Sequence, residues 1–334
     1  MATTDTSTED LYERDIADIE AQQARGTIVP AGHKPVRKTP WQVFREMPLL
    51  VKLSAIWLVV IVLAAIYAKL DTSVFDGALP LPDPNLQLNG FNPATGEFGD
   101  REPLEGPSAD HWLGTDALAR DTFARIVHGA WVSLIVVAVS VSFGVIIGGL
   151  LGSLVGFVRG RTENVIMSLV DVLLAFPALI LLLALVSIFE VRDLFVISLV
   201  IGVLSIPLYT RVARANALAI ANREFVTAAR AIGTKPTRIM FREIVPNVAP
   251  TIFAYAMVAA AAVIVVEGSL SFLGLSVQLP TSTWGNMINQ ARRDIKVDVW
   301  QVVWPSLFLT VTVLSLNQVG DFFQRRSAVR GSSL

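Results

Sequence analysis

Few residues of this sequence have the types and spacing needed for catalysis or metal binding. The three histidines, His33, His111 and His128, lie far apart and lack a nearby cluster of further ligands, so no metal site is predicted. Cysteine is absent, which excludes disulfides, thiol catalysis and cysteine-ligated metals. The sequence contains no G-x-x-x-x-G-K-[ST] phosphate loop and no Ser/His/Asp set in a predicted soluble site. We therefore expect no catalytic residue and no cofactor in this chain, so that any ATP must be bound by a partner.

The segment best suited to binding a partner runs from Arg223 to Asn247 and reads REFVTAARAIGTKPTRIMFREIVPN. It is too polar to span a membrane and too regular for a random linker. Phe225, Ala228, Ala229 and Ile232 recur at steps of three and four residues, which predicts a short helix with these residues on one face.

A turn and a second helix are predicted to follow. Gly233 suits the position just past a helix end, where a positive φ is needed. Thr234 is expected to cap the second helix, with Pro236 in its first turn, and Pro246 is expected to end it. The prediction is a helix–turn–helix elbow that carries several arginines and one lysine.

Two interpretations of this elbow remain open. It can be a docking surface whose charges fix the orientation of a partner, or an amphipathic connection that lies on the membrane surface. On the docking interpretation, the contact residues are predicted to be Glu224, Thr227, Ala228, Ala229, Arg230, Gly233, Thr234, Pro236, Arg238 and Pro246.

Two carboxylates fall within predicted membrane spans, where an ionised group is costly. Asp171 is either a contact at an inner gate or the partner of one of three arginines, Arg159, Arg161 or Arg211. Glu267 either faces a pathway or a binding partner, or is a satisfied interfacial carboxylate.

Prolines and small residues mark further candidate pathway positions. Pro177 and Pro207 interrupt the third and fourth predicted spans and can kink them, either for motion or as fixed shape. Ala259–Ala262, with Gly268, Ser269 and Ser271, gives the fifth span a narrow face, which suits close helix packing or a pathway between subunits.

These residues must be positioned by membrane helices. The chain has 334 residues, of which 53% are hydrophobic and 16% charged, against roughly 25% charged in a soluble domain. The net charge of -1 gives no support for nucleic-acid binding. Six apolar runs predict an all-α membrane protein with six transmembrane helices: Leu53–Tyr67, Trp131–Val158, Val165–Phe189, Leu194–Tyr209, Pro250–Leu275 and Val302–Val319.

The distribution of basic residues predicts the orientation. With both termini inside, 19 lysines and arginines lie on the cytoplasmic side and 8 outside. The predicted organisation is a polar cytosolic tail (1–45), a first transmembrane helix (46–70), an extracytoplasmic loop (71–125), a five-helix core (126–320) with the cytoplasmic loop 221–247, and a cytosolic tail (321–334). No cleavable signal is expected at the start, and Thr8–Gln23 is either a short acidic helix or part of a mobile extension.

The elbow resembles the cytoplasmic signature loop of binding-protein-dependent ABC importer permeases, whose pattern is Glu-Ala-Ala, three residues, Gly, and an apolar-Pro ending. Thr227-Ala228-Ala229, Gly233 and Val245-Pro246 fill that pattern, with Thr227 in place of the glutamate. Glu224, one turn earlier, is not an equivalent substitute.

Three other segments are similar to dipeptide and oligopeptide permeases of the C-subunit type. His111–Leu134 resembles the segment before their second span, with Ala119 where a glycine is usual. Asp171–Leu181 fits their third span, and Glu267–Ile288 fits the outer end of their fifth. The resemblance covers roughly residues 45–325 and leaves out the acidic N-terminal tail.

The resemblance implies the type I ABC importer permease fold in a bacterial plasma membrane. It implies uptake of di- or oligopeptides with a second, homologous permease, two ATPase domains (one fused or two separate chains) that hold ATP and Mg, and an extracytoplasmic peptide-binding protein. Alternatives are a permease of the same family for a nickel chelate, glutathione or another small solute, and a membrane scaffold without transport.

Overall fold

The computed structural model describes residues 40–75, 81–87, 91–92, 97–98, 102–189 and 193–332. The chain divides into two compact units, Met1–Met47 and Pro48–Leu334. The described part of the first unit contains helix α2 (Pro40–Glu46). The acidic helix expected at Thr8–Gln23 lies outside the described residues.

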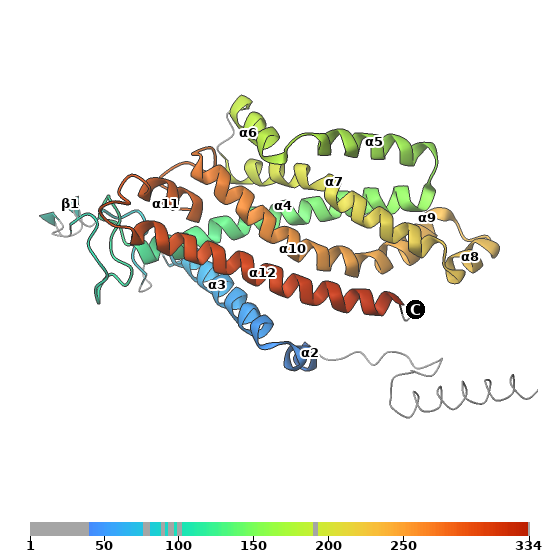
Figure 1. Cartoon of the computed structure of the whole chain (residues 1–334), viewed down its shortest axis with the longest axis horizontal. Coiled ribbons are helices and arrows are strands. Elements are labelled where there is room, and N and C mark those ends of the chain that lie inside the picture. Colours follow the sequence, from blue (N-terminus) through green and yellow to red (C-terminus); the bar gives the residue numbers. More distant parts are fainter. Residues whose placement is uncertain are drawn as a thin grey trace, which may run out of the picture. The chain divides into compact units, whose positions relative to one another are not determined.

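The second unit is a bundle of long helices. Within the part of the chain that the structure describes, five helical stretches are long and apolar enough to cross a bilayer. They are α3 (Leu49–Ser73), α4 (Thr122–Val158), α7 (Leu194–Ala221), the stretch Pro236–Phe272, and α12 (Trp300–Ser332). In α12 the part that could cross the bilayer is Trp300–Arg326. Figure 1 shows α4 beside α7 and α10 beside α12, and it places α8 and α11 at opposite ends of the bundle. The predicted all-helical membrane architecture is confirmed.

The third predicted span is a broken one. It consists of α5 (Arg161–Ala175) and α6 (Ala178–Ile188), which meet at an angle of 85°. Pro177 is the N-cap residue of α6 and lacks the N–H that would continue α5. If the bent pair is one span, the number of spans is the predicted six. Pro207, by contrast, lies inside α7 and does not end it.

Several helices extend beyond the apolar runs that predicted them. α4 begins at Thr122 rather than Trp131, because Asp121 caps it and accepts a 2.6 Å hydrogen bond from the amide of Ala124. α7 continues to Ala221, three turns past Tyr209, and its added turns carry arginines that pair with α5. The spanning helices are thus longer than the hydrocarbon layer requires.

The contact between α4 and α7 depends on a row of glycines. Gly144, Gly148, Gly152 and Gly156 recur every four residues, and a Cβ at any of them would approach α7 atoms within 2.1–2.7 Å. For example, a Cβ at Gly152 would lie 2.3 Å from the carbonyl oxygen of Thr210. The two backbones therefore pack as closely as glycine permits, a feature that the span prediction did not identify.

Shorter elements cover the α11 end of the bundle. They are the two-residue strands β1 (Phe91–Asn92) and β2 (Glu97–Phe98), which pair antiparallel, and helix α11 (Trp284–Ala291). Thr283 and Asn286 form a capping box at the start of α11, and Trp284 is fully buried beneath it.

Candidate functional site

The elbow, residues 223–247, is the part of the sequence on which docking was predicted. Its first helix, α8 (Glu224–Ala231), ends in a Schellman motif, in which the amide of Gly233 bonds the carbonyl of Arg230 and the amide of Thr234 bonds that of Ala229. Gly233 has φ +77° and no atom within 4 Å of its Cβ position. The positive φ predicted at Gly233 is confirmed.

The apolar face predicted on α8 points away from the bundle. Val226, which was not part of that face, is fully buried, whereas Ile232 is 82% exposed and Phe225 42% exposed. Ala228 is also exposed and Ala229 half-buried. Apart from Ala229, which packs against the buried cluster, this face is an uncovered apolar surface on the described part of the chain.

Thr227, the residue that replaces the family glutamate, lies on the exposed side of α8. Its hydroxyl donates to the carbonyl of Arg223 at 3.4 Å, which satisfies it within the helix. Glu224 and Arg230 lie in the first and last turns of α8, where their charges suit the helix dipole.

The second half of the elbow differs from the prediction in two respects. Helix α9 (Pro236–Ile239) has Lys235 as its N-cap residue without a side-chain cap, so Thr234 does not cap it, although Pro236 holds the predicted first position. Pro246 does not end the helix. The chain passes from α9 through the π-helical turn η1 (Met240–Ile244) into α10 (Val245–Phe272), and Pro246 stands directly after this turn, inside the continuous helical stretch Pro236–Phe272.

Buried apolar residues hold the elbow on the bundle. Val226, Ile239 and Ile244 belong to one buried cluster with Ala217 and Ala221 of α7. The guanidinium of Arg230 lies 5.1 Å from the ring centre of Phe157 on α4. The exposed residues Ile232, Arg238 and Phe241 therefore project from an elbow that the buried cluster holds in place.

The two membrane carboxylates have different surroundings. Asp171 on α5 pairs with Arg211 on α7, with 2.6 Å between Oδ1 and Nη2, and both side chains are more than half exposed. Glu267 on α10 is buried, and it accepts hydrogen bonds from Ser133 at 3.2 Å and Ser271 at 2.7 Å. The structure thus has the arginine pairing considered for Asp171 and a satisfied carboxylate at Glu267. Ser269 bonds the carbonyl of Val265.

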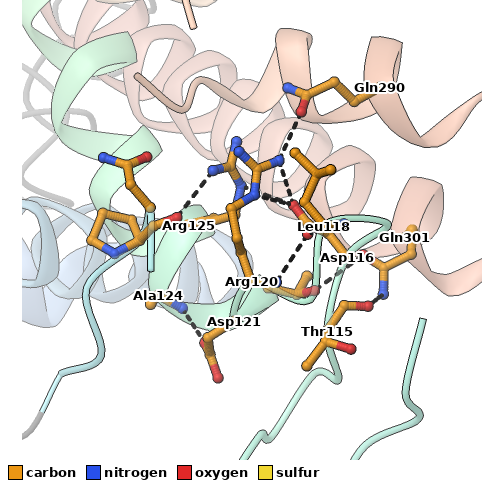
Figure 2. Close-up of polar contacts among 12 residues, drawn as sticks. Thr115, Asp116, Leu118, Arg120, Asp121, Ala124, Arg125, Gln290 and Gln301 are labelled. Atoms are coloured by element: carbon orange, nitrogen blue, oxygen red, sulfur yellow. Dashed lines mark hydrogen bonds and ion pairs between the residues drawn. The ribbon is translucent and has the colours of Figure 1, made fainter. Parts of the chain in front are cut away.

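A buried polar cluster at the α11 end was missed by the sequence reasoning. Asp116 accepts from Arg120 Nε at 2.8 Å and lies 3.5 Å from Arg125 Nε, while Arg120 Nη2 also donates to Gln290 of α11 at 2.9 Å. Figure 2 shows the two guanidinium groups directed at the Asp116 carboxylate. Gln301 of α12 donates to the carbonyl of Thr115 at 2.8 Å. These bonds fix the loop before α4 to α11 and α12.

Comparison with known proteins places the chain in a family. The family profile described as "Binding-protein-dependent transport system inner membrane component" matches residues 144–330, over half of the chain. The chain belongs to this family. It is a multi-pass protein of the bacterial inner membrane and a permease of the ABC importer type, as the motifs indicated.

Several named permeases are similar to this permease over 65% of its length. "Glutathione transport system permease protein GsiD" of Pectobacterium atrosepticum is 38% identical over 217 residues, or 72% of its own chain. "Di/tripeptide transport system permease protein DppC" of Pseudomonas aeruginosa is 39% identical over 218 residues, or 72% of its chain. "Dipeptide transport system permease protein DppC" of Alkalihalophilus pseudofirmus is 35% identical over 218 residues, or 71% of its chain.

The family places this permease in a system that also needs a binding protein, and ABC importers in general add a partner permease and ATPases. Within that frame the structure offers two surfaces at opposite ends of the bundle. One is the elbow with its exposed apolar residues, and the other is the loop layer fixed by the polar cluster (Figure 1).

Proposed function

We propose that this permease and a second, homologous permease together form the pathway for uptake of short peptides, and that the elbow couples this pathway to ATP hydrolysis by partner ATPases. The chain itself is proposed to be non-catalytic, with ATP and Mg held by the partners. Both termini and the elbow are proposed to be cytoplasmic, and an extracytoplasmic binding protein delivers the peptide to the opposite face.

The names of the relatives support the substrate class. The similar permeases are named for dipeptides, for di- and tripeptides, and for glutathione. Glutathione is itself a tripeptide with one side-chain linkage, so all of these names describe small peptides. The proposal is therefore stated for short peptides as a class, glutathione included.

The observation that carries the coupling role is the exposed apolar surface of the elbow. Phe225, Ile232 and Phe241 are 42%, 82% and 59% exposed, yet they project from a base anchored by fully buried residues. An apolar surface surrounded by charges is typical of a protein interface. Arg230, Lys235, Arg238 and Arg242 supply those charges and can fix the orientation of a partner.

The coupling role is tested with Ile232→Asp in the assembled transporter. Because a carboxylate at this exposed site disturbs an apolar contact but no core packing, we expect the permeases to assemble while the ATPases no longer co-purify or ATP hydrolysis is no longer stimulated by loaded binding protein. The matched control for ATPase co-purification is Ile295→Asp, an exposed isoleucine in the segment between α11 and α12, at the opposite end of the bundle. Unchanged co-purification and stimulation in Ile232→Asp would contradict the coupling role.

The orientation is tested with single cysteines, since the chain has none of its own. Lys235→Cys is expected to react with a membrane-impermeant thiol reagent only after the cells are opened. Val297→Cys, at a site that is 77% exposed, is expected to react in intact cells. The opposite pattern would refute the proposed topology. The substrate class is tested separately by ATP-driven uptake of labelled Gly-Gly and glutathione into vesicles that contain the complete transporter.

A further inference from the structure

A polar recess lies at the α11 end of the bundle, between the loop that follows α10 and one face of α11. Its volume is about 350 Å³, which falls within the roughly 300–1,000 Å³ of small-molecule sites. The lining contains no charged side chain. Its polar residues are Ser271, Ser276, Gln278, Asn286, Asn289 and Gln290.

Two of the lining amides are fixed by the protein itself. The side chain of Asn286 accepts from the amide of Thr283 at 3.0 Å and donates to the carbonyl of Thr281 at 2.7 Å. The side chain of Gln290 accepts from Arg120 at 2.9 Å and donates to the carbonyl of Asn286 at 3.2 Å. These groups form rigid walls.

Two other polar groups of the recess lack partners among the described residues. Ser276 is only 2% exposed, and its hydroxyl has no hydrogen bond there. The amide of Asn289, which is half-buried on the same face of α11, also makes no side-chain hydrogen bond within the described part of the chain. A buried hydroxyl without a partner is costly, so a ligand that supplies a donor or an acceptor here is favoured.

The base of the recess is held rigidly. Ser271 donates to Glu267 at 2.7 Å and accepts from Thr283 at 3.0 Å. A Cβ at Gly285 would lie 2.4 Å from the carbonyl oxygen of Gly268, so the first turn of α11 presses directly on α10. Through its hydrogen bond with Ser271, buried Glu267 positions the hydroxyl of that serine. A site with so little freedom is suited to selective binding.

We propose that this recess binds the main-chain amide groups of the transported peptide, so that the permease itself takes part in substrate selection. This inference rests on the proposed function. Hydroxyl and carboxamide groups both donate and accept, as a peptide group requires. Because the lining has no charged group, it makes no ionic contact that would favour one peptide side chain over another. A site built on hydrogen bonds rejects analogues that lack the bonding group far more strongly than one built on apolar contacts.

The test uses the assembled complex in nanodiscs without binding protein, with Leu279→Cys as a reporter at the exposed rim of the recess and with cysteine-free partner subunits. Gly-Gly at saturating concentration is expected to slow labelling by a methanethiosulfonate reagent several-fold, because bound peptide covers the reporter thiol. 5-Aminopentanoic acid, which has the same charges and chain length but no amide, is expected to give no protection.

Variants of the reporter complex separate binding from structural damage. Ser276→Ala combined with Asn289→Leu is expected to abolish protection by Gly-Gly. The matched pair Ser315→Ala with Asn317→Leu, on α12 and outside the recess, is expected to retain it. Equal protection by the two compounds, or protection that survives in the recess variant, would overturn the inference.

Two further results separate this inference from the proposed function. If Leu279→Cys fails to react in the assembled complex even without peptide, a partner subunit covers the recess and the inference is wrong. If the complete transporter takes up Gly-Gly but shows no protection, only the recess proposal fails. If the complete transporter takes up neither Gly-Gly nor glutathione, the proposed function itself fails.

Discussion

Arg211 donates a 2.6 Å hydrogen bond from Nη2 to Oδ1 of Asp171 and thereby ties α7 to α5. One turn along α7, Arg214 pairs with Glu163 near the start of α5, with 2.6 Å from Nε to Oε1. Both links join the same two helices. They fasten the first half of the broken span to α7, while its second half, α6, turns away at 85°.

The Asp171–Arg211 pair gives a first prediction. Asp171→Asn or Arg211→Gln leaves one charge without its partner, and because both side chains are more than half exposed, the pair is worth at most about 1 kcal/mol. We therefore expect the double variant to lose less stability than the two single variants lose together. A double-mutant cycle on thermal unfolding of the complex should give a coupling energy of about 1 kcal/mol. Arg161→Gln, which changes an exposed arginine with no ion pair among the described residues, is the control. A coupling energy of zero would show that the pair adds nothing.

The glycine row between α4 and α7 gives a second prediction. In Gly152→Ala the new Cβ would lie 2.3 Å from the carbonyl oxygen of Thr210 and 2.5 Å from the Cβ of Ala213. Overpacking of this kind costs about 1–3 kcal/mol, so a lower melting temperature is expected. Gly149→Ala on the same helix meets only the flexible end of Ile252 at 3.2 Å and should be neutral or slightly stabilising. Equal melting temperatures for the two variants would argue against close α4–α7 packing.

Ala119 gives a third prediction. It stands where similar permeases are expected to have glycine, and its φ is +52°, a conformation that costs an alanine about 1–2 kcal/mol. Glycine removes that strain but loses more entropy on folding, about 0.5–1 kcal/mol. Ala119→Gly is therefore expected to stabilise the permease by up to about 1 kcal/mol, measured by thermal unfolding. Ala117→Gly relieves no positive φ and should destabilise the permease slightly or have no effect. If Ala117→Gly stabilised the permease as much as Ala119→Gly, relief of the positive φ would not be the cause.

The polar cluster gives a fourth prediction. Asp116→Asn removes the carboxylate that faces two buried arginines, Arg120 and Arg125 (Figure 2). Loss of one partner of a buried ion pair costs about 3–5 kcal/mol, so the melting temperature should fall clearly and the loop before α4 should become sensitive to protease. Asp321→Asn, at an exposed site on α12, should change neither. An unaltered melting temperature in Asp116→Asn would mean that the cluster does not hold the loop.

The sequence allowed the spans to be predicted because lipid requires long apolar helices, a constraint that acts on each segment separately. Helices α4 and α7 extend beyond the predicted apolar spans because polar residues there, such as Arg125 and Arg211, are paired within the protein and need not stop a helix. Pro246 was misjudged because local proline preference does not show that the helix continues through η1 into α10.

The candidate site could be predicted only in part. The turn at Gly233 follows from local backbone preferences and was found. The side of α8 that is buried depends on α7 and α10, so periodicity identified an apolar face but did not show that Val226 is the residue buried against the bundle. The polar cluster joins Arg120 to Gln290, 170 positions apart, and no local pattern indicates such a contact. The glycine row had a visible signal, a glycine at every fourth position from Gly144 to Gly156.

The stretch Pro236–Phe272 runs without interruption from the elbow to the recess, as α9, η1 and α10. At about 1.5 Å per residue it forms a rod of about 55 Å. Ile239 is seated at one end, and Glu267 and Ser271 at the other. Under the proposed coupling, a displacement of the elbow would therefore be transmitted along this one helical stretch to the wall of the recess.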